Sequence, residues 1–284
     1  MTAGEPEISV VVPTRDRPER LRRCLARLSA QTGADRIEIV VVDDGSDDAD
    51  SVAAAVETIP GARLVRQPRR GPGAARNAGL RAARGPIACF TDDDCEPVAA
   101  WAAALSEALR AGADVVAGHT EPGDSANRYV VASQLITNYF ALHSAVPFAA
   151  SNNVASTARL LREVPFDDEY PDAAGEDRDW CQRLAAAGYR IERLAAAAVV
   201  HHQELTARGF VRQQVRYGRG SYRYHRVRRR RFLERPGFYA GLLGRGFEEG
   251  AAVGALVALA QLATAFGYLS EWLGTRRGPR DTSA

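Results

Sequence analysis

Three consecutive carboxylates end an apolar run in the first half of the chain. Residues 87–90 read IACF, which is typical of a buried strand, and Asp92, Asp93 and Asp94 follow one residue later. Three adjacent anions repel one another unless water or a cation balances them. Because hard divalent cations prefer oxygen ligands, we interpret this acidic triplet as a candidate metal site. The alternative is a plain acidic turn that leads into a helix beginning at Pro97.

Two more polar loops follow runs of β-branched residues. Residues 8–13 (ISVVVP) precede residues 14–17 (TRDR), and residues 37–42 (IEIVVV) precede residues 43–46 (DDGS). Continuous apolar runs of this length indicate strands that are buried on both faces of a parallel sheet. Because the carboxyl ends of parallel strands lie at one edge, we expect the three loops to converge on one ligand. Helices over 19–30 and 51–57, a strand over 62–66 and a third helix opened by the Gly-rich residues 71–79 complete the alternation.

The second half of the chain carries two more groups of candidate residues. Gly175 precedes a helix whose first turn contains Glu176 and Asp177, where the helix dipole also stabilises carboxylates for purely structural reasons. His201 and His202 end a short apolar run, either as metal ligands or as ordinary strand-end residues. Since neighbouring residues of a strand point to opposite faces, only one of the two can face a site. We further expect a strand over 114–118, a helix over 126–144, a small-residue strand over 149–155 and a helix end at Gly188.

Composition restricts the class of protein. The chain has 284 residues, enough for one large domain, and a formal net charge of only +2, so the chain as a whole is not a polyanion binder. All 37 basic residues are Arg. Four cysteines without CxxC spacing indicate a reduced, cytosolic protein rather than a disulfide framework or a zinc site. The N-terminal residues lack the charged and apolar regions of a secretory signal, so we expect none.

Five sequence motifs occur in an order that is typical of one enzyme family. They are ISVVVPTRDRPERL, VVDDGS, GPGAARNAG, FTDDDCEP and GEDRDW, and a late His pair follows them. With these motifs, residues 8–205 resemble family 2 glycosyltransferases of the GT-A fold. The resemblance implies an α/β fold with a Rossmann-like, mostly parallel sheet flanked by helices. It implies a glycosyltransferase domain over 1–205, with a nucleotide-binding half at about 8–97 and an acceptor half at about 98–205, followed by a C-terminal helical extension over 206–284.

The resemblance also assigns the donor site. A carboxylate of Asp43 or Asp44 would suit the imide N–H of a uracil-like base, and the guanidinium of Arg76 would suit a phosphate. The expected donor is a UDP-sugar, with a GDP- or dTDP-sugar as the alternatives. The residues implied to hold this nucleotide sugar come from the three loops and the Gly-rich segment, namely Pro13, Thr14, Arg15, Asp43, Asp44, Arg76, Asp92 and Asp93.

Metal binding and catalysis are implied in the same way. The GEDRDW motif implies that Asp177, with Glu176 beside it, is the general base that takes the proton from an acceptor hydroxyl. That hydroxyl would attack the anomeric carbon in line, which inverts its configuration. The implied cofactor is Mn²⁺ or Mg²⁺, and an imidazole ligand would favour Mn²⁺. The implied metal ligands are Asp94 with Asp92, and either His201 or His202.

The C-terminal part of the sequence differs in composition from the rest. Residues 208–235 are dense in Arg with interleaved aromatic residues, and only Glu234 offsets the charge. Residues 251–269 follow without a single charge and are about as long as the shortest bilayer spans. We interpret both features as contact with an anionic membrane surface, because such residues concentrate at membrane interfaces. A plain charged surface is the alternative, and nucleic-acid binding is not expected. Residues 251–269 could span the bilayer, lie on it or pack on a partner subunit, such as the second copy of a homodimer.

We therefore expect a metal-dependent, inverting glycosyltransferase at the cytoplasmic face of the membrane. Its acceptor would be a hydroxyl of a glycan, lipid or peptide, in cell-envelope or lipid-linked glycan synthesis. One alternative is a sugar-nucleotide nucleotidyltransferase, but that would need a Gly-rich loop with a basic residue where this chain has residues 13–16 (PTRD). The other alternative is a catalytically silent sugar-nucleotide-binding module, against which the intact acidic triplet and the pair of Glu176 and Asp177 argue.

Overall fold

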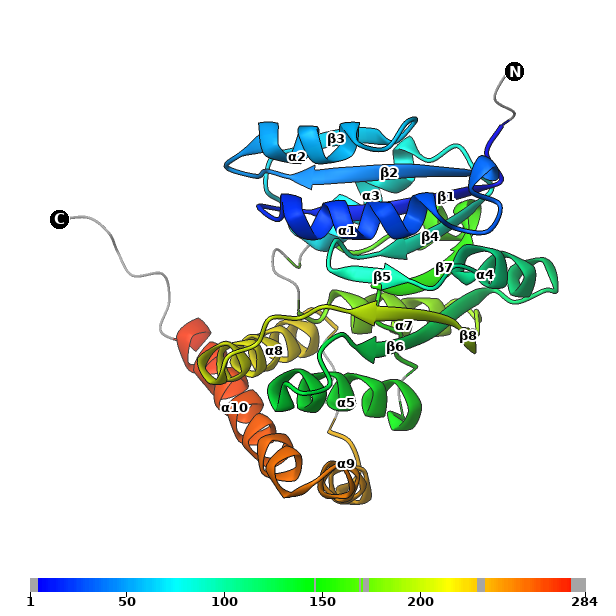
Figure 1. Ribbon diagram of the computed structural model, residues 1–284. Helices are drawn as coiled ribbons and strands as arrows, with labels where there is room; N and C mark the ends of the chain where they lie inside the picture. The colour runs from blue at the N-terminus through cyan, green and yellow to red at the C-terminus, as the bar shows by residue number, and fades with distance from the viewer. Residues whose placement is uncertain (1–4, 146, 169, 171–173, 229–232, 277–284) are drawn as a thin grey trace. The chain divides into compact units, whose positions relative to one another are not determined.

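Contacts divide the chain into two compact units. The computed structural model describes residues 5–145, 147–168, 170, 174–228 and 233–276 (Figure 1). The first unit comprises Met1–Gly123, Val146–Pro171 and Asp177–Gln203, and the second comprises Asp124–Ala145, Asp172–Glu176 and Glu204–Ala284. Part of the Arg-rich stretch, residues 229–232, lies outside the described residues. The domain limits of 1–205 and 206–284 stay a prediction.

The first unit is built on one eight-stranded sheet. Within the described residues the strand order is β3-β2-β1-β4-β7-β6-β8-β5. Four of the seven strand pairs are parallel and three are antiparallel, so the sheet is mixed and mostly parallel, as predicted. The strands are β1 (Ile8–Thr14), β2 (Ile37–Asp44), β3 (Arg63–Gln67), β4 (Ile87–Thr91), β5 (Cys95–Pro97), β6 (Val115–Pro122), β7 (Asn153–Thr157) and β8 (Ile191–His201).

Alternate residues of the central strands face two layers of helices. Val10 and Val41 lie in an apolar cluster with the helices of one face, and Val11 and Val40 lie in a second cluster with the helices of the other. Because both faces are covered, β1 and β2 are continuous apolar runs. One face carries α1 (Pro18–Ser29), α2 (Ala49–Glu57) and α4 (Trp101–Arg110), and a 3₁₀ turn (Ala34–Arg36) precedes β2. The other face carries α3 (Pro72–Ala82), α6 (Ala158–Glu163) and α7 (Glu176–Ala186).

Two expectations about the segments next to the acidic triplet were wrong. Pro97 does not begin a helix, because it ends β5, which pairs antiparallel with β8, and α4 begins only at Trp101. A proline after polar residues is common both at strand ends and at helix starts, so a partner strand far along the chain decided between them. The strand predicted over 149–155 begins only at Asn153, and it runs antiparallel to β4 and β6.

Asn153 joins the three strands that position the end of β8. Its side-chain amide donates to the carbonyl oxygens of His119 on β6 (2.8 Å) and Ala197 on β8 (2.9 Å), and its oxygen accepts from the indole of Trp101 (2.8 Å). Gly118 leaves room for this side chain, since a Cβ there would lie 2.3 Å from the Asn153 oxygen. A satisfied buried amide of this kind holds the strands in one register.

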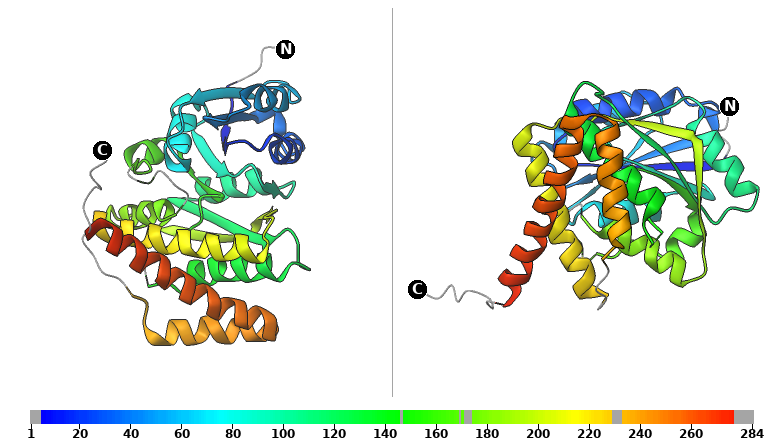
Figure 2. Two further views of the ribbon diagram at one scale, coloured as in Figure 1. Left: turned by 90° about the vertical axis from the view of Figure 1, so that its left-hand side faces the viewer. Right: turned by 90° about the horizontal axis from the view of Figure 1, so that it is seen from below.

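The second unit is helical. Thr206 caps the N-terminus of α8, because its hydroxyl accepts from the Gly209 N–H. Helices α8 and α10 lie side by side (Figure 2). They approach closely because Gly218 and Gly267 have no side chain at the contact, where a Cβ would lie about 2 Å from the facing backbone. Aromatic residues predicted in the helix over 126–144, such as Tyr129 and Tyr139, pack in the apolar core of this unit. The helices are α5 (Arg128–His143), α8 (Ala207–Val227), α9 (Pro236–Glu248) and α10 (Ala251–Arg276).

Candidate active site

The three polar loops meet at the carboxyl ends of β1, β2 and β4. The hydroxyl of Thr14 donates to the Asp93 carboxylate at 2.7 Å, which joins the first loop to the third. The Asp16 N–H donates to the Ser46 hydroxyl at 2.9 Å, which joins the first loop to the second. Asp16 adopts a left-handed backbone (φ 55°), a conformation that Asp tolerates better than most residues. The predicted convergence of the three loops is confirmed.

Asp44 organises the Gly-rich segment. Its carboxylate accepts the backbone N–H groups of Arg70 and Gly71, each at 2.8 Å, and the side-chain amide of Gln67 at 2.7 Å. Gly71 has φ 93°, and α3 begins at the next residue. The buried Asp44 therefore holds the start of α3 in place, so that its carboxylate is already engaged within the protein.

The other predicted nucleoside residues lie around the same edge. Asp43 is buried, and its carboxylate accepts the Ser46 N–H at 2.9 Å. Arg15 donates from Nε to the carbonyl oxygen of Gly45 at 3.3 Å. Pro13 is buried within β1. Asp43 and Arg15 thus line the junction of the β1 and β2 loops, while Pro13 contributes to the strand beneath it.

Arginines balance the acidic triplet. Arg76 is buried, and its Nη2 lies 2.6 Å from the Asp92 carboxylate. Arg17 reaches the carboxylates of Asp93 (3.2 Å) and Asp94 (3.3 Å) from the start of α1. No local pattern in the sequence distinguishes Arg17, because only the packing of α1 next to the triplet gives it a role.

Burial and mutual repulsion change the acidity of the triplet. Burial and the neighbouring Asp94 charge raise the pKa of Asp93 to about 7, against the effect of Arg17. Burial also acts to raise the pKa of Asp94, but the hydrogen bond with His201 and the nearby arginines outweigh it and hold the pKa below its ordinary value. Burial acts to lower the pKa of His201, but the hydrogen bond and charge of Asp94, together with the charge of Asp92, outweigh it and raise the pKa above its ordinary value. Asp94 is therefore a stronger acid than its neighbour Asp93.

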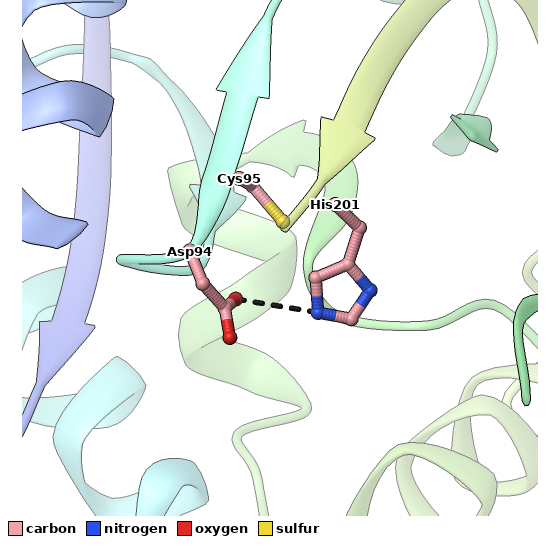
Figure 3. A group of neighbouring side chains, drawn as sticks. All are labelled: Asp94, Cys95 and His201. Carbon is pink, nitrogen blue, oxygen red and sulfur yellow. Dashed lines mark ion pairs between the residues drawn. The ribbon is translucent and has the colours of Figure 1, made fainter. Parts of the chain in front are cut away.

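Asp94 and His201 form the centre of a group that could hold a metal ion. Figure 3 shows Asp94, Cys95 and His201 pointing toward one another, with an Asp94 oxygen 3.3 Å from His201 Nε2. One ligand atom from each of the three lies within 4.8 Å of the others. Burial raises the pKa of the Cys95 thiol well above its usual range, so the donors that remain are a carboxylate and an imidazole. These donors fit Mn²⁺, which accepts both oxygen and nitrogen ligands.

The two histidines point in different directions, as expected for neighbours on a strand. His202 Nε2 lies 3.2 Å from the Glu96 carboxylate, whereas His201 faces Asp94. Asp92 is paired with Arg76, and its predicted share in the metal site stays a prediction. The structure therefore brings the His201 side chain to the acidic triplet, whereas His202 contacts Asp94 only through its backbone N–H, which donates to the Asp94 carbonyl oxygen at 2.7 Å.

Asp177 lies close enough to the triplet to share its charges. One carboxylate oxygen accepts the Ser151 N–H at 3.2 Å, and the other is buried without a hydrogen-bond partner among the described residues. Burial raises the pKa of Asp177, while the positive charge of Arg76 lowers it and the negative charge of Asp92 raises it. A buried carboxylate with a raised pKa and one oxygen left over is suited to accept a proton.

The remaining residues around Asp177 have structural contacts. Glu176 is the buried first residue of α7. The guanidinium of Arg76 lies 5.6 Å from the centre of the Phe166 ring, and Asn77 on α3 exchanges hydrogen bonds with the Phe166 backbone at 2.8 and 3.0 Å. Asn77 lies inside the GPGAARNAG motif, but no local pattern marks its role, because its partner Phe166 is distant in sequence.

Comparisons with known proteins agree with this fold. The family model described as Glycosyl transferase family 2 matches residues 9–168, and the model described as Glycosyl transferase family group 2 matches residues 115–273. A solved structure, the mannosyltransferase PcManGT from Pyrobaculum calidifontis in complex with GDP-Man and Mn²⁺, superposes with a TM-score of 0.57. It is 23% identical and aligns with 96% of this chain and 80% of its own, which supports the GT-A type of fold.

Curated relatives are glycosyltransferases of greater length. Glycosyltransferase AglE of Haloferax volcanii is 29% identical in an alignment of 237 residues that covers 78% of this chain and 74% of the relative. The pre-mycofactocin glycosyltransferase of Mycobacterium tuberculosis is 28% identical over 232 residues, 75% of this chain and 46% of the relative, so the match spans less than half of that protein. Since the first family model covers more than half of the chain, this protein belongs to glycosyl transferase family 2 and is a glycosyltransferase.

Proposed function

We propose that this protein is a metal-dependent, inverting glycosyltransferase that moves a sugar from a nucleotide diphosphate to a hydroxyl acceptor. The observation that carries the proposal is the grouping of the acidic triplet, His201, Arg76 and Asp177 at one edge of the sheet. A carboxylate–imidazole pair, a buried guanidinium and a basic carboxylate are the groups that this reaction needs.

Asp94 and His201 would hold the metal, since their donor atoms already face each other. A bound divalent cation would neutralise the negative charge of the donor diphosphate. Arg76 is held by Asp92 and the Phe166 ring, so its charge is fixed in position for a phosphate. Asp177 would accept the proton of the acceptor hydroxyl on its free oxygen. The hydroxyl oxygen would then bond to the anomeric carbon on the side opposite the departing nucleoside diphosphate, and this in-line displacement inverts the configuration.

We propose a UDP-sugar as the donor, with GDP- and dTDP-sugars as the alternatives. The structure of the mannosyltransferase from Pyrobaculum calidifontis contains GDP-Man, which supports a nucleoside diphosphate sugar as the donor class. For the acceptor we propose a hydroxyl of a lipid-linked or cell-envelope glycan at the cytoplasmic face of the membrane. The one helix among the described residues that is long and apolar enough to cross a membrane, Ala251–Thr275, supports that location.

Thermal unfolding with a panel of sugar nucleotides tests the donor and the metal together. A ligand that binds only the folded protein at a hundred times its Kd stabilises it by about 2.7 kcal/mol. We expect one of UDP-, GDP- or dTDP-sugars to raise the Tm in the presence of Mn²⁺, and to do so much less without it. The variant Asp94→Asn should lose the metal dependence. If no sugar nucleotide changes the Tm with or without Mn²⁺, the proposal fails.

Release of the nucleoside diphosphate separates an enzyme from a silent binding module. The same panel is incubated with Mn²⁺, and the product is quantified by chromatography. Slow hydrolysis of the stabilising donor is expected even without an acceptor, because water can take the place of the hydroxyl. If the sugar nucleotide binds but no nucleoside diphosphate is released, even with membrane extract as a source of acceptor, the protein is a catalytically silent binding module.

A further inference from the structure

One face of α10 exposes large apolar side chains in a regular row. Leu259, Leu262, Phe266, Leu269 and Leu273 are between 42% and 69% exposed. Their spacing of 3, 4, 3 and 4 residues places them on a single face of the helix, and we call this row the apolar stripe. Monomeric soluble proteins rarely expose contiguous apolar patches of this kind unless something covers them.

The opposite face of α10 packs on α8. The Thr264 hydroxyl lies 3.4 Å from the Gln214 carbonyl oxygen, and Gly267 packs on the backbone of Val215. Near the end of the helix, Glu271 pairs with Arg223 of α8 at 3.2 Å. The apolar stripe therefore points away from α8, and the second unit itself does not bury it.

The residues beside the stripe argue against a partner helix in water. A coiled-coil seam in water is normally flanked by charged residues, which keep the free helix soluble and select the partner. Here the flanking positions are uncharged, and the first charge after residue 251 is Glu271, which faces α8. A face without charge over about 30 Å of helix suits hydrocarbon better than water.

Arginines supply the second part of the surface. Arg208, Arg212, Arg216 and Arg226 are exposed on α8, at intervals that place them along one side of that helix. Trp272 lies near the C-terminal end of α10, and tryptophan concentrates at membrane interfaces. Positive charge on α8, the helix on which α10 packs, attracts the protein toward anionic headgroups.

We propose that the apolar stripe inserts into the surface of an anionic lipid bilayer, with α10 lying in the plane of the membrane rather than crossing it. The helix is long enough to cross, at about 39 Å for 26 residues against about 30 Å of hydrocarbon. A crossing is excluded by α8, which lies along the C-terminal half of α10 and would carry its arginines into the hydrocarbon, where charge is strongly disfavoured. The proposal deepens the membrane location given above, and it rests on that location but on neither the donor nor the metal.

Flotation of the full-length protein with vesicles tests the insertion. Phosphatidylcholine vesicles are compared with vesicles that also contain phosphatidylglycerol. We expect binding to the anionic vesicles, and about tenfold or greater weakening in the double variant Leu262→Gln and Phe266→Gln, because the lost apolar area drives insertion. The matched control is Leu142→Gln, which changes an exposed leucine of α5 and should bind like the original.

Three outcomes decide the insertion. Reduced binding of Arg212→Glu with Arg216→Glu to anionic vesicles supports the lipid partner. Failure of the unaltered protein to bind, or equal binding by the double variant, overturns it. If the double variant instead converts a dimer into a monomer in light scattering while vesicle binding is unchanged, the stripe is covered by a second copy of the chain. None of these assays involves a nucleotide, so their failure leaves the transferase reaction to its own test.

Cysteine labelling tests whether α10 lies in the plane. Glu249→Cys and Gly274→Cys place a thiol on an exposed residue just before α10 and near its end, both outside the apolar stripe, and all four native cysteines are buried. In inside-out membrane vesicles, a membrane-impermeant maleimide should label both variants. Labelling of one end only would mean that the helix crosses the bilayer, and would overturn this part of the proposal.

Discussion

Arg76 is the residue on which the charges of the candidate site depend. Its guanidinium is buried against the Phe166 ring, pairs with Asp92 and acts on Asp177. A buried cation that serves two carboxylates couples the donor side of the site to the acceptor side. Replacing it would leave both carboxylates without their counter-charge, which is more costly than the loss of a single surface pair.

Replacing Asp177 by Asn should separate catalysis from donor binding. The amide keeps the shape but does not accept a proton, so kcat should fall by about 10²- to 10⁴-fold. Donor affinity, measured by titration calorimetry with Mn²⁺ present, should change less than threefold. The exposed Asp35→Asn serves as the control for a neutralised aspartate far from the triplet. A large loss of donor affinity would show that Asp177 binds the donor instead.

Arg17 should compete with a metal for the acidic triplet. It lies 3.2–3.3 Å from Asp93 and Asp94, so a cation arriving at Asp94 meets its positive charge. Arg17→Ala should therefore strengthen Mn²⁺ binding about fivefold, the equivalent of about 1 kcal/mol for one charge at this range in water. Electron paramagnetic resonance of free Mn²⁺ measures the change. Arg22→Ala, on the same helix but paired with Glu19, should leave the affinity as it is.

At the scale of elements, the amino ends of the central strands are joined by one glutamate. Glu38 of β2 accepts from the Ser9 hydroxyl of β1 at 2.6 Å, from the Gly85 N–H before β4 at 3.2 Å, and from Arg63 of β3 at 3.1 Å. Four neighbouring strands thus share one carboxylate at the edge opposite the candidate site. These hydrogen bonds fix the amino ends of the strands relative to one another. The same register then positions the carboxyl ends, which carry the three loops.

Glu38 should make the free energy of unfolding depend on pH in the acidic range. Burial alone would raise its pKa, but hydrogen bonds from Ser9, Arg84 and Arg63 lower it from 4.5 to about 2. A carboxylate with a lowered folded-state pKa contributes stability that is complete above pH 4.5 and is lost as the pH falls toward 2. Glu38→Gln should cost about 3 kcal/mol at pH 7 and flatten the dependence between pH 4.5 and 2. Urea unfolding at several pH values measures both effects.

The control for this experiment is Glu57→Gln, an exposed glutamate at the end of α2. It should leave both the stability at pH 7 and the acid dependence unchanged. If Glu38→Gln unfolds at the same urea concentration as the original protein, the carboxylate does not hold the strands.

At the scale of the whole molecule, the order of elements along the chain differs from their grouping in space. Helix α5 lies between β6 and β7 in sequence, but its residues Ala132 and Ile136 are buried in the core of the second unit with Phe210 and Leu242. The catalytic strands and the helical unit are therefore not separable by a single cut. The predicted boundary near residue 205 would divide α5 from its core.

A chain that ends at residue 205 tests this directly. Without α8, α9 and α10, the apolar face of α5 loses its partners, so we expect aggregation or a clear loss of solubility relative to the full chain. Analytical ultracentrifugation and circular dichroism measure the outcome. A monomeric, folded fragment that still binds a sugar nucleotide would establish 1–205 as an independent domain.

The sequence by itself determined the parallel half of the sheet, the convergence of the three loops and the family. These features depend on local patterns: β-branched runs, polar loops directly after them, and motifs in a particular order. Residues 8–97 contain the strand and loop patterns and four of the five motifs within short distances of one another, so few alternative arrangements of this half were compatible with the sequence.

The tertiary structure alone decided which residues of that edge meet. The choice of His201 over His202, the pairing of Pro97 in a strand and the contacts of Arg17 all depend on partners far away along the chain. A shift of one residue in the register of β8 would have turned the other histidine toward Asp94. Such registers follow from the packing of whole elements, so no local pattern in the sequence contains them.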